Sequence, residues 1–283
     1  MKNRVTIIAE IGANHNGDMG LAKEMIWAAS ENGADYAKFQ SWQASKIPPG
    51  PWDTNEPFFQ FKNKRHFYES AQLTNEQHYI LIEECKKANI KFLTTCFDRE
   101  RVDFLSSLPL DTIKVASCDA TSKTMLTELS EKFDNLIVST GMTSFDEIQS
   151  LNNHLVDLNT NFTLLHCIAM YPTPLEKVNP ERFEKIKSIV GNQGNVGISD
   201  HSLGTTWPIL AVMLGATCIE KHFTIDTKIP GPDNHMSITP DELLTIRSFC
   251  SEYSEIGSNS SIHPYQEEID LRKIIQNRFG NNA

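Results

Sequence analysis

Eight short runs of β-forming residues recur along the chain, and segments with the spacing of amphipathic helices separate them. The strand-like runs are residues 4–12, 34–40, 90–97, 111–117, 135–142, 162–170, 195–201 and 216–224. Such alternation is typical of β–α units around a parallel sheet. Eight units in about 255 residues have the size of a closed (β/α)₈ barrel, so the sequence predicts a TIM barrel.

The predicted helices carry signals for their ends. They run from Leu21 to Gly33, Thr74 to Asn89, Ser144 to Leu158, Pro208 to Gly215 and Thr239 to Gly257. Several begin at a Ser or Thr, which caps the first turn, or end at Gly or Asn. The last helix opens with Thr239, Pro240 and Glu242, which together form the pattern of a capping box with Pro in the first turn.

Two segments do not fit the repeat. Residues 41–66 are rich in Pro and aromatic side chains, and so long an excursion in a compact domain indicates an active-site loop. Residues 256–283 are polar apart from a short amphipathic piece at 269–275. We therefore expect residues 1–255 to form the catalytic barrel and residues 256–283 to form a C-terminal extension.

The overall charge and the cysteines narrow the class of protein. A net charge of −10 argues against a protein that coats nucleic acid or an anionic membrane. The N-terminus lacks the features of a signal peptide, and no apolar run approaches the roughly 18 residues of a membrane span. The six cysteines are scattered without CxxC spacing, which favours reduced thiols in a soluble, cytoplasmic protein.

Polar residues follow every predicted strand at its carboxyl end, where barrels of this kind carry their active sites. They are Glu10, Asn14, His15, Lys38, Gln40, Thr94, Thr95, Lys114, Ser117, Ser139, Thr140, His166, Tyr171, Ser199, Asp200, His201, Glu220 and His222. Each has an ordinary structural explanation, because buried His is usually hydrogen-bonded and Ser or Thr often caps the next helix. Their coincidence at all eight strand ends favours a functional site.

Two kinds of chemistry stand out in this set. His201 and His222 follow neighbouring strands and could bind a borderline divalent cation as neutral imidazoles, although the pattern by itself leaves the metal open. Lys38 and Lys114 supply two cations that suit a small phosphorylated acid. The hydroxyls that would complete this cradle belong to Thr95, Ser117, Ser139 and Ser199.

Eight sequence blocks, in order, carry a resemblance to a known family. They are IAEIGANHNGD, YAKFQSW, FLTTCFD, IKVASCDA, IVSTGM, LHCIAMYPTP, GISDHSLG and IEKHFTIDTKIPGPDNHMS. Together they resemble the sialic acid synthase family, the N-acetylneuraminate synthase type, and they cover nearly the whole chain. The resemblance implies a barrel that condenses phosphoenolpyruvate with an amino-sugar aldose to give a nonulosonic acid and phosphate.

The resemblance also implies roles for individual residues. His201 and His222 would bind a divalent metal, Mn²⁺ in the first place, with Mg²⁺ and Co²⁺ as alternatives. Phosphoenolpyruvate would be held by Lys38, Thr95, Lys114, Ser117, Ser139 and Ser199, and the sugar by Gln40, Asp119, Tyr171 and Asp233. Catalytic roles are expected for Glu10, Lys38, Lys114, Asp119 and Glu220; whether Glu10, Glu220 or the metal activates water is left open.

Three departures from the family pattern bear on the acceptor sugar. Asp119 stands where the family commonly has Glu, and Ile168 and Ala169 replace polar residues after strand six. Family members usually continue into an antifreeze-like domain, which reaches over the partner's site in a swapped dimer. This chain ends at Ala283, so we expect no such domain here. The oligomer that the resemblance implies is a homodimer, and the sequence leaves open whether it forms without the swapped domain. We therefore expect an acceptor other than N-acetylmannosamine.

Two rival functions compete with the synthase. A metal-dependent sugar isomerase or epimerase on the same barrel would use His and carboxylates but would not need the lysine and hydroxyl cradle. A non-catalytic sugar-binding barrel would have no need for Lys38, Lys114, His201 and His222 together. Binding of phosphoenolpyruvate distinguishes the first rival, and turnover with added Mn²⁺ distinguishes the second.

Overall fold

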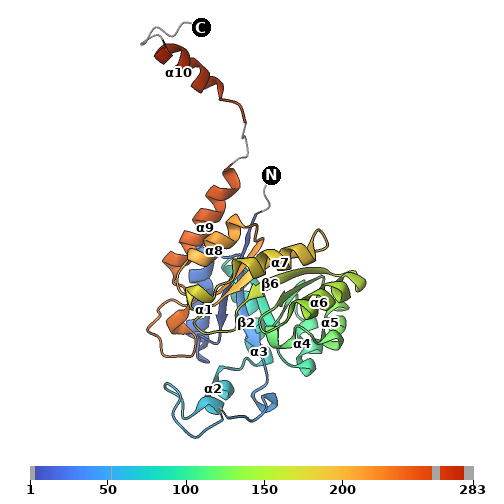
Figure 1. Ribbon diagram of the computed structural model, residues 1–283. Coiled ribbons are helices and arrows are strands. Elements are labelled where there is room, and N and C mark those ends of the chain that lie inside the picture. The colour runs from blue at the N-terminus through green and yellow to red at the C-terminus, as the bar shows by residue number, and fades with distance from the viewer. Residues whose placement is uncertain (1–3, 52, 257–261, 277–283) are drawn as a thin grey trace.

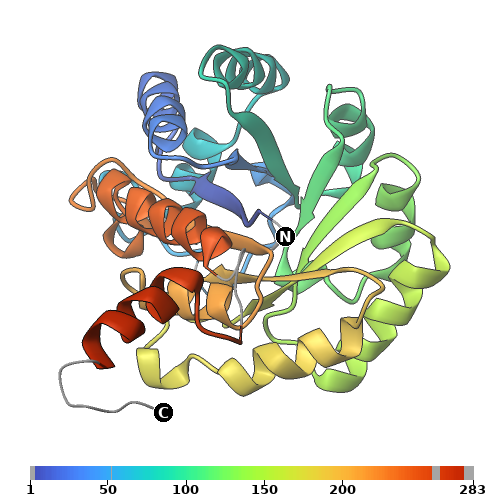
Figure 2. The same cartoon turned by 90° about the horizontal axis from the view of Figure 1, so that it is seen from above.

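The computed structural model describes residues 4–51, 53–256 and 262–276. Within them, eight parallel strands pair in sequence order, and the last strand pairs with the first to close a barrel (Figures 1 and 2). The strands are β1 Thr6–Gly12, β2 Tyr36–Ser41, β3 Lys91–Cys96, β4 Thr112–Val115, β5 Asn135–Ser139, β6 Asn161–Cys167, β7 Asn195–Asp200 and β8 Cys218–His222. The predicted TIM barrel is confirmed, and each strand lies within or overlaps its predicted run.

Helices form the outer ring of the barrel, as the view down its axis shows (Figure 2). The helices are α1 Met19–Glu31, α2 Lys64–Ala71, α3 Asn75–Lys87, α4 Val102–Ser106, α5 Lys123–Ser130, α6 Phe145–Asp157, α7 Pro180–Val190, α8 Thr206–Met213, α9 Pro240–Glu255 and α10 Gln266–Gln276. Of these, α2 belongs to the excursion after β2 and α10 lies beyond α9, so these two are not part of the ring (Figure 1). The predicted capping box of α9 is present, because the Thr239 backbone N–H donates to Glu242 at 2.9 Å. Its hydrogen bonds satisfy backbone groups that the first helical turn leaves unpaired.

The two-residue alternation of each strand decides which side chains enter the barrel. A small apolar layer of Ile8, Leu93, Ile137, Leu165 and Cys218 fills the interior at mid-height. The intervening residues of the strands pack outward against the helices in one large core. Polar side chains that point inward beyond the apolar layer therefore converge in a closed space at the carboxyl end.

The excursion after β2 is folded and has a small core of its own. Trp42, Phe61 and Phe67 pack with Ala13 of the β1 loop and with Ala71 of α2. In Figure 1 this segment projects beyond the barrel on the side opposite the N-terminus, at the carboxyl ends of the strands. The excursion thus forms a wall next to the predicted site.

The last described segment lies apart from the barrel. Every described residue from 262 to 276 is exposed, and Figure 1 shows α10 beyond the end of α9. This agrees with an extension that has little core, although the boundary at residue 255 stays a prediction. All six cysteines are free thiols. Within the described segments, no helix combines the length and apolarity that crossing a membrane requires.

Candidate active site

A buried lysine on β2 connects three neighbouring strands inside the barrel. The Lys38 ammonium lies 2.8 Å from a carboxylate oxygen of Glu10 on β1 and 3.5 Å from one of Glu220 on β8. It also donates a hydrogen bond of 3.0 Å to the hydroxyl of Thr95 on β3. Because charges removed from water are costly unless they are paired, these contacts are what permits Lys38 to be buried.

A second buried lysine completes the cluster. The Lys114 ammonium donates to the Ser139 hydroxyl at 2.7 Å and to the Val115 carbonyl at 2.8 Å, and it lies 3.8 Å from Glu220. The hydroxyl of Ser199 donates to the same Glu220 carboxylate at 2.9 Å. Two lysines, two carboxylates and three hydroxyls from different strands therefore meet in one buried space.

The two carboxylates of this cluster have opposite proton affinities. Burial raises the pKa of Glu10 to about 7, against the opposing attraction of Lys38. Burial also acts to raise the pKa of Glu220, but Lys114 and Lys38 outweigh it and lower that pKa to about 2. Glu220 is therefore the permanent anion of the cluster, and Glu10 is the group able to gain or lose a proton near neutral pH.

The two predicted metal ligands lie side by side at the mouth of the barrel. The imidazole centroids of His201 and His222 are 5.5 Å apart. The Nδ1 of His201 is 2.9 Å from the Ile168 carbonyl, and a hydrogen bond donated from Nδ1 leaves Nε2 as the free ligand atom. Burial lowers the pKa of His222, which favours the neutral imidazole that a metal needs.

The two imidazoles are suited to bind a metal ion, but they supply only two of its ligands. The Nδ1 of His222 is buried without a hydrogen-bond partner, and the Asp233 carboxylate lies 3.9 Å from it. Among the described residues, no group of three or more His, Cys, Asp and Glu side chains is arranged to hold a metal ion. Any cation held by His201 and His222 would take its remaining ligands from water or substrate.

The predicted sugar residues surround this mouth. The Tyr171 ring centroid lies 4.1 Å from that of His201 and 6.2 Å from that of His222. The Gln40 amide donates to Glu10 at 2.7 Å, so it connects the mouth to the lysine cluster. Gln40, Tyr171, His222 and Asp233 all line one cavity of about 360 Å³.

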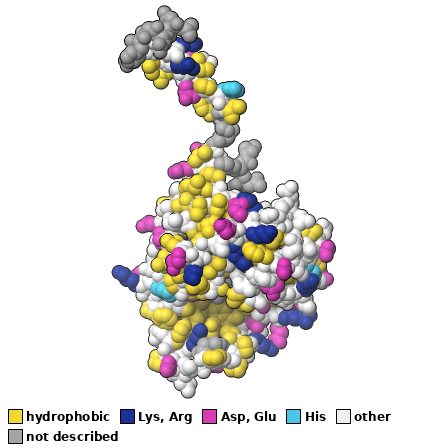
Figure 3. Space-filling view, viewed as in Figure 1, with side chains coloured by type: hydrophobic (Ala, Val, Ile, Leu, Met, Phe, Trp, Pro, Cys, Tyr) yellow, Lys and Arg dark blue, Asp and Glu magenta, His cyan; other side chains and the backbone are white. Residues whose placement is uncertain are grey.

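The excursion supplies the aromatic wall of that cavity. The wall consists of Trp42, Phe58, Phe67 and Tyr68, with Lys64 beside them. Figure 3 shows hydrophobic side chains around the hollow in the lower half of the view, near the level of the excursion. The sequence indicated an active-site loop here, but nothing in the pattern showed which of its aromatic residues would face the site.

Two predicted residues are less closely joined to the others. The Ser117 hydroxyl accepts a hydrogen bond of 2.9 Å from the Gly141 backbone N–H and lies beside the Cys167 thiol. Asp119 lies two residues further on, where its carboxylate contacts the Cys118 thiol at 3.3 Å. Burial raises the pKa of Asp119. Within the described part of the chain, no hydrogen bond or ion pair joins its carboxylate to Lys38, Lys114, His201 or His222.

The strand alternation removes several polar residues from the site. Thr94, Thr140, His166 and Asp200 follow or precede the inward residues, so they point outward toward the helices. The His166 ring packs against Trp207 of α8 with centroids 5.9 Å apart, and the Thr140 hydroxyl donates to the Leu165 carbonyl. Conversely, the alternation brings in Cys167, whose sulfur lies 4.0 Å from His201 and which the sequence had not marked.

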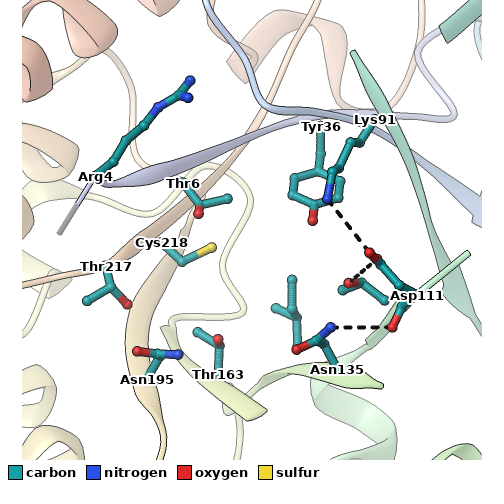
Figure 4. Close-up of a pocket in the computed structure, with 12 residues that line it drawn as sticks. Arg4, Thr6, Tyr36, Lys91, Asp111, Asn135, Thr163, Asn195, Thr217 and Cys218 are labelled. Carbon is teal, nitrogen blue, oxygen red and sulfur yellow. Dashed lines mark hydrogen bonds and ion pairs between the residues drawn. The ribbon is translucent and has the colours of Figure 1, made fainter. Parts of the chain in front are cut away.

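A separate cavity of about 330 Å³ lies at the amino ends of the strands, as Figure 4 shows. Its walls carry Thr6, Tyr36, Lys91, Asp111, Asn135 and Asn195, among others. The Lys91–Asp111 pair in it is 3.7 Å long, and both side chains are more than half exposed. Among the described residues that line this cavity, no charged side chain is buried, and none of the predicted site residues is among them.

Comparison with known proteins agrees with this geometry. A model of the NeuB family matches residues 25–260. The chain belongs to the NeuB family. It is 34% identical to an N,N'-diacetyllegionaminic acid synthase of Legionella pneumophila, over 95% of this chain and 78% of that protein. Its identity to the Campylobacter jejuni enzyme of the same name is 37%, over 89% of this chain and 76% of that protein.

The solved structure of a sialic acid synthetase is also similar. The N-acetylneuraminic acid (sialic acid) synthetase of Leptospira borgpetersenii superimposes with a TM-score of 0.82 at 30% identity. The match covers 99% of this chain and 94% of that one. Family membership and the (β/α)₈ fold are therefore shown, and the family predicted from the eight sequence blocks is confirmed.

Proposed function

We propose that this NeuB-family chain condenses phosphoenolpyruvate with an amino-sugar aldose, giving a nonulosonic acid and inorganic phosphate. The Legionella pneumophila and Campylobacter jejuni relatives are synthases of such an acid by name. The observation that carries the proposal for this chain is the buried cluster of Lys38 and Lys114 beside the His201–His222 pair. A sugar isomerase does not have to bind a phosphate and a carboxylate together, so it does not require this lysine and hydroxyl cradle.

The lysine cluster is suited to an anion that carries both a carboxylate and a phosphate. Lys38 and Lys114 hold their positions through Glu10 and Glu220, so the binding geometry exists before the ligand arrives. The hydroxyls of Thr95, Ser139 and Ser199 already point at these charged groups. Phosphoenolpyruvate would replace part of the carboxylate contacts with its own oxygens.

We propose that His201 and His222 hold a divalent cation, with Mn²⁺ in the first place and Mg²⁺ or Co²⁺ as alternatives, as the family resemblance implies. Two imidazoles favour a transition metal over Mg²⁺, and Mn²⁺ accepts the oxygen ligands that water and substrate would supply. When bound, such a cation polarises a carbonyl oxygen as a Lewis acid. Tyr171 and Asp233 lie beside the two imidazoles and would orient the aldehyde end of the sugar. The two lysines neutralise the charge of phosphoenolpyruvate and place its enol carbon against that aldehyde.

Proton transfer falls to the carboxylates of the cluster. The reaction forms a bond between the enol carbon and the aldehyde carbon, adds water at the carbon that bears the phosphate ester, and releases phosphate. We assign Glu10 as the general base that takes a proton from that water, because its pKa is about 7. Its carboxylate is held in place by Lys38 and Gln40. Glu220 stays ionised and holds both lysines in place.

The acceptor we propose is an aldose with two acylamino groups instead of N-acetylmannosamine. Two relatives make a product with two N-acetyl groups, as its name states. The wall of Trp42, Phe58 and Phe67 offers apolar contact to acetyl methyl groups, and polar side chains are absent at Ile168 and Ala169. An exposed, mostly polar sugar would gain less from such a wall.

Two further expectations concern the location of the protein in the cell and its oligomeric state. Free thiols and the demand for phosphoenolpyruvate support a cytoplasmic location, which we include in the proposal. A homodimer stays a prediction.

A coupled phosphate-release assay with Mn²⁺ over a panel of aldoses tests the whole proposal. We expect phosphate release that requires both phosphoenolpyruvate and an acceptor, with a diacylamino aldose preferred. N-acetylmannosamine as the best acceptor would refute the acceptor assignment and leave the condensation intact. Interconversion of sugars without phosphate release would favour the isomerase.

A further inference from the structure

A buried ion pair lies directly behind the two imidazoles, on the outer face of the same strands. The Lys221 ammonium is 2.7 Å from the Asp200 carboxylate, and each side chain is only 2% exposed. Asp200 precedes His201, and Lys221 precedes His222. A buried ion pair contributes little net stability, because desolvation offsets the attraction between its charges. Its position therefore calls for another explanation.

The Asp200–Lys221 pair lies at the end of the β7–β8 ladder, beyond which no sheet hydrogen bond fixes His201 relative to His222. The β7–β8 ladder ends at the Asp200–Lys221 partners, so His201 lies just beyond the last ladder position. On the inner face, the hydroxyl of Ser199 donates to Glu220 across the same strands. On the outer face, the Asp200–Lys221 pair makes the corresponding connection.

The same two side chains also fix the turn that carries His201. The Asp200 carboxylate accepts hydrogen bonds from the backbone N–H of Ser202 at 2.7 Å and from its hydroxyl at 3.1 Å. Lys221 donates to the Ser202 carbonyl. The backbone on one side of His201 is thus bonded to the residue that precedes His222. A shift of either strand end would have to break a buried charged contact.

We propose that Asp200 and Lys221 are positioning residues, which hold His201 and His222 at the separation and orientation that a divalent cation requires. The inference rests on the metal-binding role given to the two imidazoles in the proposed function. It assigns the pair to metal affinity instead of to phosphoenolpyruvate binding, since neither side chain contacts the lysine cluster. Loss of a group that fixes the orientation of a metal ligand typically weakens metal binding by about tenfold to a hundredfold.

The test measures Mn²⁺ affinity of the metal-free protein, by electron paramagnetic resonance of the free ion, in Lys221→Met and Asp200→Asn. We expect Mn²⁺ binding about tenfold to a hundredfold weaker. Phosphoenolpyruvate affinity, measured by calorimetry without metal, should stay within about twofold, and excess Mn²⁺ should restore kcat. Unchanged Mn²⁺ affinity in the folded variants would overturn the inference.

A double variant provides a test in case a single variant misfolds. Asp200→Asn combined with Lys221→Met leaves no unpaired buried charge, so it should fold even where a single variant does not. It should still bind Mn²⁺ more weakly, and wild-type affinity in it would contradict the positioning role. Arg247→Met is the matched control, because it breaks the Arg247–Asp35 pair at the amino end. This control should lower the melting temperature without changing Mn²⁺ affinity.

A separate variant, His222→Ala, tests whether the imidazole pair binds the metal at all. If His222→Ala binds Mn²⁺ as well as the wild type, the imidazole pair is not the metal site. The positioning inference can then be read without metal, from the separation of the two imidazole centroids, 5.5 Å in the wild type. A crystal structure of Lys221→Met that retained this separation would refute it.

Discussion

Both ends of the barrel are polar and hollow, but they treat charge in opposite ways. At the carboxyl end, Lys38, Lys114, Glu10 and Glu220 are 3–7% exposed and pair across strands. At the amino end, Lys91 and Asp111 are 64% and 54% exposed. The two cavities have similar volumes, about 360 and 330 Å³. Cavity size does not distinguish them, whereas the burial of charge does.

The difference matters because buried charge is costly to maintain. An exposed pair such as Lys91–Asp111 contributes about 0–1 kcal/mol and needs no functional explanation. The four buried groups at the other end could be replaced by apolar side chains with little loss of stability. Their presence supports our proposal that the carboxyl end is the reactive one. If so, substitutions at the carboxyl end should affect turnover far more than substitutions at the amino end.

The largest effect is expected for His222→Ala. Removal of one of two imidazoles should abolish metal-dependent phosphate release, by at least about a thousandfold, since Lewis-acid assistance supplies several kcal/mol. The fold should remain, because His222 lies at the strand end outside the apolar layer. Circular dichroism provides the control, and a folded variant with unchanged turnover would contradict the metal assignment.

A somewhat smaller loss is expected for Lys114→Met. The substitution removes one cation of the cradle and leaves Glu220 with Lys38 alone, so kcat/KM for phosphoenolpyruvate should fall by about a hundredfold to a thousandfold. The Mn²⁺ affinity should change little. If phosphoenolpyruvate binds the variant normally in calorimetry, the cradle has been misassigned.

Asp233→Asn should weaken binding of the acceptor sugar without weakening binding of phosphoenolpyruvate. We expect the acceptor KM to rise by about tenfold or more at saturating Mn²⁺, because a charged hydrogen-bonding partner at the mouth is lost. The KM for phosphoenolpyruvate should stay within about twofold. Equal changes in both constants would show that Asp233 acts on the whole site.

Glu10→Gln should alter the pH dependence of stability. The folded-state pKa of Glu10 is raised from 4.5 to about 7, so its contribution is fully present below pH 4.5 and is lost as pH rises through about 7. Gln imitates the protonated form and does not titrate. The stability of the wild type relative to the variant should therefore decline between pH 4.5 and 7 in urea unfolding. A constant difference would show that the pKa of Glu10 is not raised.

The smallest effect is expected at the amino end. Lys91→Ala removes an exposed cation from the cavity of Figure 4, and phosphate release should change by less than about twofold. Comparison with Lys114→Met contrasts an exposed and a buried lysine of the same barrel. A loss at Lys91 as large as that at Lys114 would remove the distinction between the two ends.

The sequence by itself determined the barrel and the end at which its polar residues gather. Strand and helix periods are local, so the eight strands, the capping box at Thr239 and the polar carboxyl ends could be predicted without coordinates. The resemblance added the expected roles of the lysines, hydroxyls and imidazoles, which stay predictions. The site could not be predicted completely, because Thr94, His166 and Asp200 stand at strand ends as polar as their inward neighbours.

Tertiary structure decided what each of those side chains does. Closure of the sheet brings Lys38 to Glu10 and Glu220, which lie 28 and 182 positions away in the chain. It also turns Asp200 and Lys221 outward into a pair of their own. Such partners depend on distances between strands remote in sequence, and a pattern of local periods contains no information about them.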